Sequence, residues 1–401
     1  MRSVFVGGVG MTPFGKFADR TVGQLAQEAV TGALADAGVG VDEVETVFYA
    51  NAAAGLMTGQ EMVRGQIALR ETGLLGKPIT NVENACASAS TAANLAWLSV
   101  ASGQADIALA VGAEKLSHPD KTRAFNALAA AVDQERLDEL KAALYNEHAD
   151  PLKTGDRSFF MDVYADMAKK YMARSGATLE DFAAVAVKSH RHASLNPRAQ
   201  YRNQVTVEEV LASRHISGPL TLLMCSPIGD GAAAAVFCSE EVRARLQAPT
   251  VRVRASALVS GREGDSSETA VERAAKRAYE TAGLGPEDVD VAEVHDAAAP
   301  AELIIYEELG LAAPGEGPKL LASGETTIGG KLPVNTSGGL ISKGHPVGAT
   351  GLAQLVELTE QLRGTVGERQ VEGARVAIAE NGGGYLGPDP AAVCVTILSR
   401  D

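Results

Sequence analysis

Two distant stretches of this chain repeat one another, and this repeat constrains the fold more than any other sequence feature. Residues 37–53 read AGVGVDEVETVFYANAA, and residues 282–298 read AGLGPEDVDVAEVHDAA. The two stretches share their glycines, an acidic pair and the apolar run that follows it. We therefore expect two copies of one α/β unit, related by pseudo-symmetry, within a single chain.

A second match pairs two predicted helices. One begins at Cys86 with CASASTAANLAWL, and the other begins at His345 with HPVGATGLAQLVEL. Thr91 and Thr350 occupy the same position in the two segments. Each helix leads to a strand that ends in a loop, AVGAE in the first copy and AIAEN in the second. Pseudo-symmetry would bring the two helix starts together, so Cys86 and His345 are expected to face each other.

The rest of the chain alternates between helical and strand-like segments, which indicates an α/β fold. Residues 22–38 have apolar residues at helical spacing and end at a glycine, whereas the opening MRSVFVGGVG is typical of a first strand. At 401 residues the chain exceeds one ordinary core, and we place two domains at residues 1–248 and 249–401. Residues 116–226 are rich in charge, have little strand signal and are predicted to be an insertion.

Composition argues against several classes of function. The net charge of −14 disfavours nucleic acid as a partner, because phosphate contacts need a basic surface. No run of about 18 apolar residues exists, so no membrane-spanning helix is expected. The cysteines are scattered without a CxxC pair, which favours a reducing cytoplasm over a disulfide framework or a zinc site.

Four segments carry residue types suited to acyl transfer. Cys86 starts a helix, where the dipole and the free N–H groups favour a thiolate. His345 lies in a loop of glycines and a proline, expected to be rigid and open, and can accept the thiol proton. Glu380 ends a strand before three glycines whose N–H groups can bind an oxyanion, and His295 ends another strand. Each also has a structural interpretation: packing for Cys86, a turn for His345, a solvated strand end for Glu380 and a satisfied histidine for His295.

A basic segment, KSHRHASLNPRAQYR, lies in the predicted insertion of this acidic chain. Its residues Arg191, Arg198 and Arg202 form either a solvated face or a docking patch for the phosphates of an anionic cofactor. Other motifs fail: GGVGMTPFG has Pro13 where a dinucleotide fingerprint needs its last glycine, and HRH lacks further spaced ligands for a metal. We predict no metal site.

The segments NACASAS, CSPIGDGAAAAV, EVHDAAAPAELIIYEELGL and NTSGGLISKGHPVGATG together resemble the thiolase superfamily, and its sterol-carrier-protein branch most of all. The resemblance runs over nearly the full length of the chain. It implies a duplicated five-layer αβαβα fold with a lid inserted in the first half. It also implies a homodimer or a dimer of dimers, and a ping-pong reaction on acyl-CoA with no permanently bound cofactor.

Carried over by position, the resemblance makes Cys86 the acylated nucleophile and His345 the group that activates it. The backbone N–H groups of Cys86 and Gly382 would bind the tetrahedral oxyanion, and Ser226 matches a position that contacts the pantetheine arm of CoA. Two departures stand out. Where the sterol-carrier branch has His-Asp-Cys-Phe, this chain has HDAA, and the second catalytic cysteine of ordinary thiolases aligns with Glu380. Either Glu380 or His295 is therefore the second acid/base.

Three functions follow from the resemblance. The first is a CoA-dependent C-acyltransferase that cleaves a 3-oxoacyl-CoA or runs the reverse Claisen condensation. The second is a thiolase-fold aldolase, or an acyltransferase with a non-CoA acceptor, that works with a small accessory subunit of oligonucleotide-binding-type fold. The third is a non-catalytic acyl-CoA-binding scaffold. The retained Cys86 and His345 favour the first.

Overall fold

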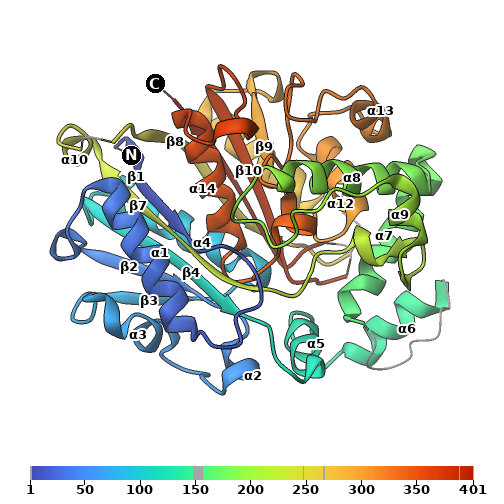
Figure 1. Ribbon diagram of the computed structural model, residues 1–401, viewed down its shortest axis with the longest axis horizontal. Coiled ribbons are helices and arrows are strands. Elements are labelled where there is room, and N and C mark those ends of the chain that lie inside the picture. Colours follow the sequence, from blue (N-terminus) through green and yellow to red (C-terminus); the bar gives the residue numbers. More distant parts are fainter. Residues whose placement is uncertain (1, 148–156, 247, 265–266, 388, 401) are drawn as a thin grey trace.

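The computed structural model describes residues 2–147, 157–246, 248–264, 267–387 and 389–400. Residues 148–156 of the predicted insertion lie outside the described residues. In Figure 1 the N-terminal half, blue to cyan, lies beside the C-terminal half, orange to red. The predicted domain boundary after residue 248 falls between helix α10 (Glu240–Arg243) and strand β8 (Val251–Ser260).

Nine strands form one continuous mixed sheet in the order β3-β2-β4-β7-β1-β8-β11-β10-β9. The segment predicted as a first strand is β1, which lies in the middle of the sheet. The strands are β1 (Val4–Met11), β2 (Thr46–Ala50), β3 (Ile79–Val82), β4 (Ile107–Lys115), β7 (Asp230–Ser239), β8, β9 (Val291–Glu293), β10 (Val376–Gly383) and β11 (Ala392–Ser399).

The strand pairing confirms the duplication that the sequence repeat predicts. In the first half β2 runs parallel to β4, β4 antiparallel to β7, and β7 antiparallel to β1. In the second half β9 runs parallel to β10, β10 antiparallel to β11, and β11 antiparallel to β8. The halves join where Phe5 and Val6 of β1 pair with Arg252 and Val251 of β8.

Three layers of helices alternate with the two halves of the sheet, which gives the predicted five-layer thiolase-like arrangement. Helix α1 (Val22–Ala37) packs on the outer face of the first half and ends at Gly38, whose φ of 65° suits a glycine. Helices α4 (Ser88–Ala101) and α14 (Thr350–Arg363) share one core with strands of both halves. Helices α11 (Ala270–Ala282) and α12 (Ala299–Glu308) cover the outer face of the second half.

The segment predicted as an insertion is mainly helical where the structure describes it, and α7 and α8 pack against α12. The figure shows these helices in green beside the C-terminal half (Figure 1). The elements of the predicted insertion are α5 (Lys121–Ala129), α6 (Leu137–Glu147), α7 (Phe159–Ser175), α8 (Leu179–Ser194), α9 (Val207–Ala212), β5 (His215–Ser217) and β6 (Leu220–Thr221). The remaining short helices are α2 (Ala54–Thr58), α3 (Arg64–Ala68) and α13 (Gly317–Ala322). In the described ranges no helix is long and apolar enough to cross a membrane.

Candidate active site

Cys86 lies at a helix start, as predicted. It occupies the middle of a 3-10 turn, Ala85–Ala87, that leads directly into α4. Ala85 adopts a φ of 49°, in the left-handed region, and its N–H donates to the Glu83 carboxylate over 2.6 Å. A non-glycine residue in this region costs of order 1–3 kcal/mol, and such strain is a common way to aim a reactive side chain. Here it turns the chain sharply just before Cys86.

Two glycines allow the segments around Cys86 to approach closely. A Cβ on Gly351, at the start of α14, would lie 2.5 Å from the Ser90 backbone nitrogen in α4. A Cβ on Gly383, at the end of β10, would lie 2.2 Å from the Asn84 carbonyl oxygen. Both distances are far shorter than a real contact, so only glycine fits. The two helix starts therefore meet as the pseudo-symmetry predicts.

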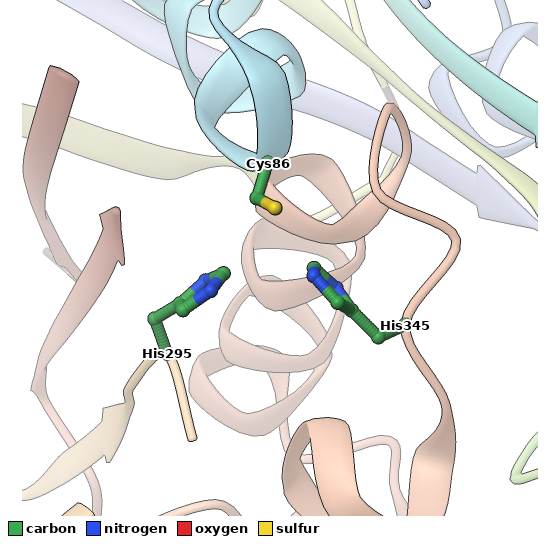
Figure 2. Close-up of side chains that lie close together, drawn as sticks. All are labelled: Cys86, His295 and His345. Carbon is green, nitrogen blue, oxygen red and sulfur yellow. The ribbon is translucent and has the colours of Figure 1, made fainter. Parts of the chain in front are cut away.

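Three side chains converge where these segments meet (Figure 2). The Cys86 Sγ and one ring nitrogen each of His295 and His345 all lie within 4.8 Å of one another. The two imidazole rings stand edge to face, with centroids 5.1 Å apart and an interplanar angle of 85°. Cys86 precedes α4 in the first half of the chain, whereas His295 follows β9 and His345 precedes α14 in the second half. The site therefore exists only because both halves contribute to it.

The His345 ring is held in one orientation by Thr350. His345 Nδ1 lies 2.7 Å from Thr350 Oγ1, and that hydroxyl donates to the Pro346 carbonyl oxygen over 3.1 Å. Because the single hydroxyl hydrogen is used there, Thr350 Oγ1 accepts from Nδ1–H, and Nε2 is left unprotonated. The expectation of an open loop is wrong, since residues 333–350 are buried and His345 is only 7% exposed.

Burial also sets the charge of His345. It lowers the pKa of the imidazole well below its ordinary value, and the neighbouring His295 and Lys343 lower it further. His345 is therefore neutral at physiological pH. A neutral imidazole with a free Nε2 is the form that accepts a proton.

His295 has a more adaptable partner. Its Nδ1 lies 2.9 Å from the side-chain nitrogen of Asn381, and Ser90 Oγ lies 2.8 Å from the Asn381 oxygen. An amide can donate to a ring nitrogen through its NH₂ or accept from it through its oxygen. His295 can therefore carry its proton on either nitrogen. Burial lowers its pKa to about 4, so it too is neutral.

The Cys86 thiol does not have the lowered pKa that its helix-start position suggested. Burial first, and then the charge of Glu114, raise its pKa to about 12. Glu114 is fully buried at the end of β4 and accepts from the backbone N–H groups of Ala52 and Gly348, over 2.9 and 3.2 Å. Desolvation of the thiolate outweighs the helix dipole, so the thiol and His345 meet as a neutral pair.

Glu380 is not one of the three converging side chains, although it lines the same cavity. Strand β10 continues through Gly383, so Glu380 is inside the strand and not at its end as predicted. Its carboxylate accepts the backbone N–H of His295 over 3.0 Å. Burial raises its pKa to about 7, as expected for a carboxyl group in a dry site. Glu380 thus supports the segment of His295, and His295 is the group beside the thiol.

A cavity of about 570 Å³ opens beside Cys86. Gly382 and Ser226 line it, as do the three converging side chains and Glu380, and the Ser226 N–H donates to the Ala297 carbonyl oxygen over 3.0 Å. Much of the wall is apolar and comes from α7, α12 and the HDAA segment. Its members include Met161, Tyr164, Met167, Ala297, Ala301, Ile304 and Ile305.

The arginine patch predicted from the sequence does not reach this cavity. Arg198 binds Glu360 of α14 through both guanidinium NH₂ groups, one of them at 3.0 Å, so its charge is already neutralised. Arg191 and Arg202 are exposed and are not part of the cavity wall. The exposed cations on the wall are Lys16, Lys121 and Arg214. The physical reason is that a sequence segment shows basic residues but not the acidic partner that folds against them.

Sequence reasoning also missed three residues that shape the site: Thr350, Asn381 and Glu114. The match between Thr350 and Thr91 in the repeat was the only signal for the first. Asn381 directly follows Glu380 in the same strand, and a single sequence does not show which of two consecutive strand residues faces an imidazole. Glu114 acts through backbone N–H groups, which carry no sequence signature.

Comparisons with known proteins point to one family. The model described as thiolase, N-terminal domain matches residues 4–241, and the model described as thiolase C-terminal domain-like matches residues 253–400. An acetyl-CoA acetyltransferase from Methanothermobacter thermautotrophicus is 40% identical over the full length of both chains. Sterol carrier protein 2 from Bos taurus is 40% identical over 94% of this chain and 69% of its own. The solved structure of an Ltp2-ChsH2(DUF35) aldolase superposes with a TM-score of 0.80 at 28% identity, covering 100% of this chain and 98% of that one.

Proposed function

Because this chain belongs to the thiolase family of acyltransferases, we propose that it transfers acyl groups between CoA thioesters through an acyl-Cys86 intermediate. One observation carries the proposal: Cys86 Sγ and the ring nitrogens of His295 and His345 converge within 4.8 Å at the wall of a cavity. Acyl-CoA is the substrate, and no resident cofactor is required. An aldol cleavage needs no acyl-enzyme, so this arrangement favours acyl transfer over the aldolase alternative.

In the first half-reaction the thiol and the imidazole act together. As Cys86 Sγ attacks the carbonyl carbon of the bound substrate, His345 Nε2 takes the thiol proton. The tetrahedral oxyanion collapses, the leaving group departs with the proton that His345 returns, and the acyl group stays on sulfur. Since the thiol pKa is about 12, proton transfer accompanies attack and does not precede it.

The second half-reaction needs a group that moves a further proton, and we assign this to His295. In the synthetic direction His295 takes the Cα proton of the acceptor acyl-CoA, and the enolate carbon attacks the acyl carbon. The C–S bond to Cys86 breaks, and the sulfur regains a proton. In the thiolytic direction His295 takes the proton of the incoming CoA thiol. Its amide partner Asn381 suits both tautomers, which supports this role.

Intact-mass analysis tests the proposal directly. After incubation with a panel of acyl-CoA thioesters, we expect one acyl group per chain, located on Cys86 by peptide mapping. Cys225 also lines the cavity, so Cys225→Ser is the matched control and should acylate normally. Absence of any acyl adduct, or an adduct on Cys225, together with no cleavage of 3-oxoacyl-CoA, would overturn it.

The exposed cations of the cavity wall offer a docking place for the phosphates of CoA. We propose Lys16, Lys121 and Arg214 for this role, because exposed surface cations bind phosphate without first losing a partner. Lys16→Ala with Arg214→Ala should weaken CoA binding, and most strongly at low salt. Arg191→Ala with Arg202→Ala removes the same charge elsewhere and should have no effect. Equal losses from both pairs would assign the effect to net charge.

We also propose that two copies of the chain associate along strand β3. This strand is an edge of the large sheet, and Met62, Val63 and Ile67 beside it are 76, 54 and 41% exposed. An edge strand with exposed apolar neighbours is an unstable surface for a lone chain. Light scattering should give a dimer mass that Met62→Asp with Val63→Asp reduces; an unchanged mass would refute this interface.

An accessory subunit is a further proposal. The Ltp2-ChsH2(DUF35) aldolase, which shares this fold, joins two components in its name, and this supports a second subunit for the present chain too. Full turnover by the isolated chain would make that subunit dispensable.

A further inference from the structure

The three converging side chains have the composition of a metal site. Thiolate and imidazole are preferred ligands of Zn²⁺, and Cys86, His295 and His345 offer one thiol and two imidazoles. In a tetrahedral zinc site, bonds of about 2.0–2.3 Å place ligand atoms roughly 3.3–3.6 Å apart. The three atoms here all lie within 4.8 Å of one another. Side-chain rotations that move each ligand atom by about 1 Å therefore suffice to reach this geometry.

The hydrogen bonds behind both histidines fit the same interpretation. Metal-binding histidines usually bond their second ring nitrogen to a protein group, which fixes the ring and directs the other nitrogen to the metal. Nδ1 of His345 is hydrogen-bonded to Thr350 Oγ1, and Nδ1 of His295 is hydrogen-bonded to the Asn381 amide. Both Nε2 atoms remain for a ligand between the rings.

The Asn381 amide can satisfy the tautomer that a metal requires. With its oxygen toward His295, Asn381 accepts from Nδ1–H and leaves Nε2 free to bind. Its NH₂ group then donates to Ser90 Oγ, which lies 2.8 Å from the Asn381 side chain, while Ser90 donates to the Ala87 carbonyl oxygen over 2.9 Å. Every polar group in this chain of bonds then has a partner.

The cavity completes the site. The three ligands come from three separate segments and face a cavity of about 570 Å³, so a fourth coordination position faces this open space. Three protein ligands with one open position, which takes water or another small ligand, differ from the closed four-ligand arrangement of structural zinc sites. A bound ion would hold the sulfur and both nitrogens, the atoms on which acyl transfer depends.

We propose that Cys86, His295 and His345 form a Zn²⁺ site whose occupation reversibly blocks the nucleophile. On binding, Zn²⁺ replaces the thiol proton, which is released to water, and no redox change takes place. The metal is an inhibitor and takes no part in acyl transfer. The inference concerns metal binding alone and is measured on unreacted protein, so it stands or falls separately from the proposed function.

Two measurements on the metal-free chain test the site. Titration with Zn²⁺ against a competing chelator should give one site per chain, and saturating Zn²⁺ should slow iodoacetamide labelling of Cys86 by at least about tenfold, because coordination occupies the thiolate. Chelator should restore the original rate.

Variants distinguish this site from a surface one. His295→Ala removes a ligand and should abolish the protection of Cys86. Thr350→Val removes only the support of a ligand and should weaken zinc binding by about 10–100-fold. His215→Ala removes an exposed histidine and should change nothing. Unchanged zinc affinity in His295→Ala, or bound zinc that leaves Cys86 labelling at full speed, would overturn the proposal, even if acylation proceeds as expected.

Discussion

Replacing Thr350 with Val tests the proposed role of the His345 tautomer more sharply than removing Cys86 or His345 would. Valine keeps the shape of the side chain and deletes the hydroxyl that accepts from His345 Nδ1 over 2.7 Å. The ring stays, the cavity stays, and Cys86 is untouched. What changes is the nitrogen on which His345 carries its proton.

The structure sets the size of the effect. Leaving a buried N–H without an acceptor costs about 1–3 kcal/mol. The ring can avoid this cost by moving its proton to Nε2, the atom that accepts the thiol proton in the proposed reaction. At about 1.4 kcal/mol per factor of ten, the competent tautomer becomes about 5–150-fold rarer, and Cys86 acylation should slow by the same factor.

The assay is single-turnover acylation of Cys86, followed by intact mass. Thr350→Ser keeps the hydroxyl and should acylate at close to the normal rate. Thr91→Val is the matched control from the other half, because the Thr91 hydroxyl donates to the Ala87 carbonyl oxygen over 2.8 Å and bonds to neither His295 nor His345. Acylation by Thr350→Val at the normal rate, with stability lowered, would refute the tautomer argument.

Three further outcomes are expected. Iodoacetamide labelling of Cys86 should speed up about tenfold per pH unit from pH 7 to pH 10, because its pKa is raised to about 12; a plateau near neutral pH would contradict this. Glu380 has a folded-state pKa of about 7 against an ordinary 4.5, so folding takes up a proton and stability falls as pH rises through this window. In urea unfolding, the free energy of unfolding of Glu380→Gln relative to the parent protein should therefore rise by about 3 kcal/mol between pH 4 and pH 8. A pH-independent difference would show that the carboxyl group titrates normally. Arg198→Ala should lower the free energy of unfolding by about 1 kcal/mol through loss of the ion pair with Glu360, while leaving the affinity for CoA unchanged. Weaker CoA binding by this variant would show that Arg198 contributes to the CoA-binding site.

The sequence was sufficient to group Cys86 with His345, and the reason is the repeat. Two copies of one unit place equivalent helix starts around a common axis, so a nucleophile in one copy and an imidazole in the other must meet. His295 could be included because it ends a strand in a repeated segment. The alternation of helices and strands likewise predicted the α/β class, whereas the five layers were predicted from the resemblance to the thiolase superfamily.

Charge states and ion pairs could not be predicted in this way, because they depend on contacts between distant residues. The helix start at Cys86 suggested a lowered thiol pKa, but burial beside Glu114 has the larger effect and the opposite sign. Arg198 was a candidate for binding phosphate, but the fold brings it against Glu360, 162 residues away. Glu380 was the titratable residue in the right loop, yet its carboxylate binds the backbone of His295.

Because the site is built from both halves of the chain, it cannot form while the nascent chain is incomplete. A ribosome delivers Cys86 early and His345 near the end of synthesis, roughly 10–50 seconds later at ordinary elongation rates. During that interval the cysteine lacks His345, and the helix α14 that must pack against α4 does not yet exist. Reactivity toward thioesters in the cell therefore begins only when the last quarter of the chain has emerged and folded against the first.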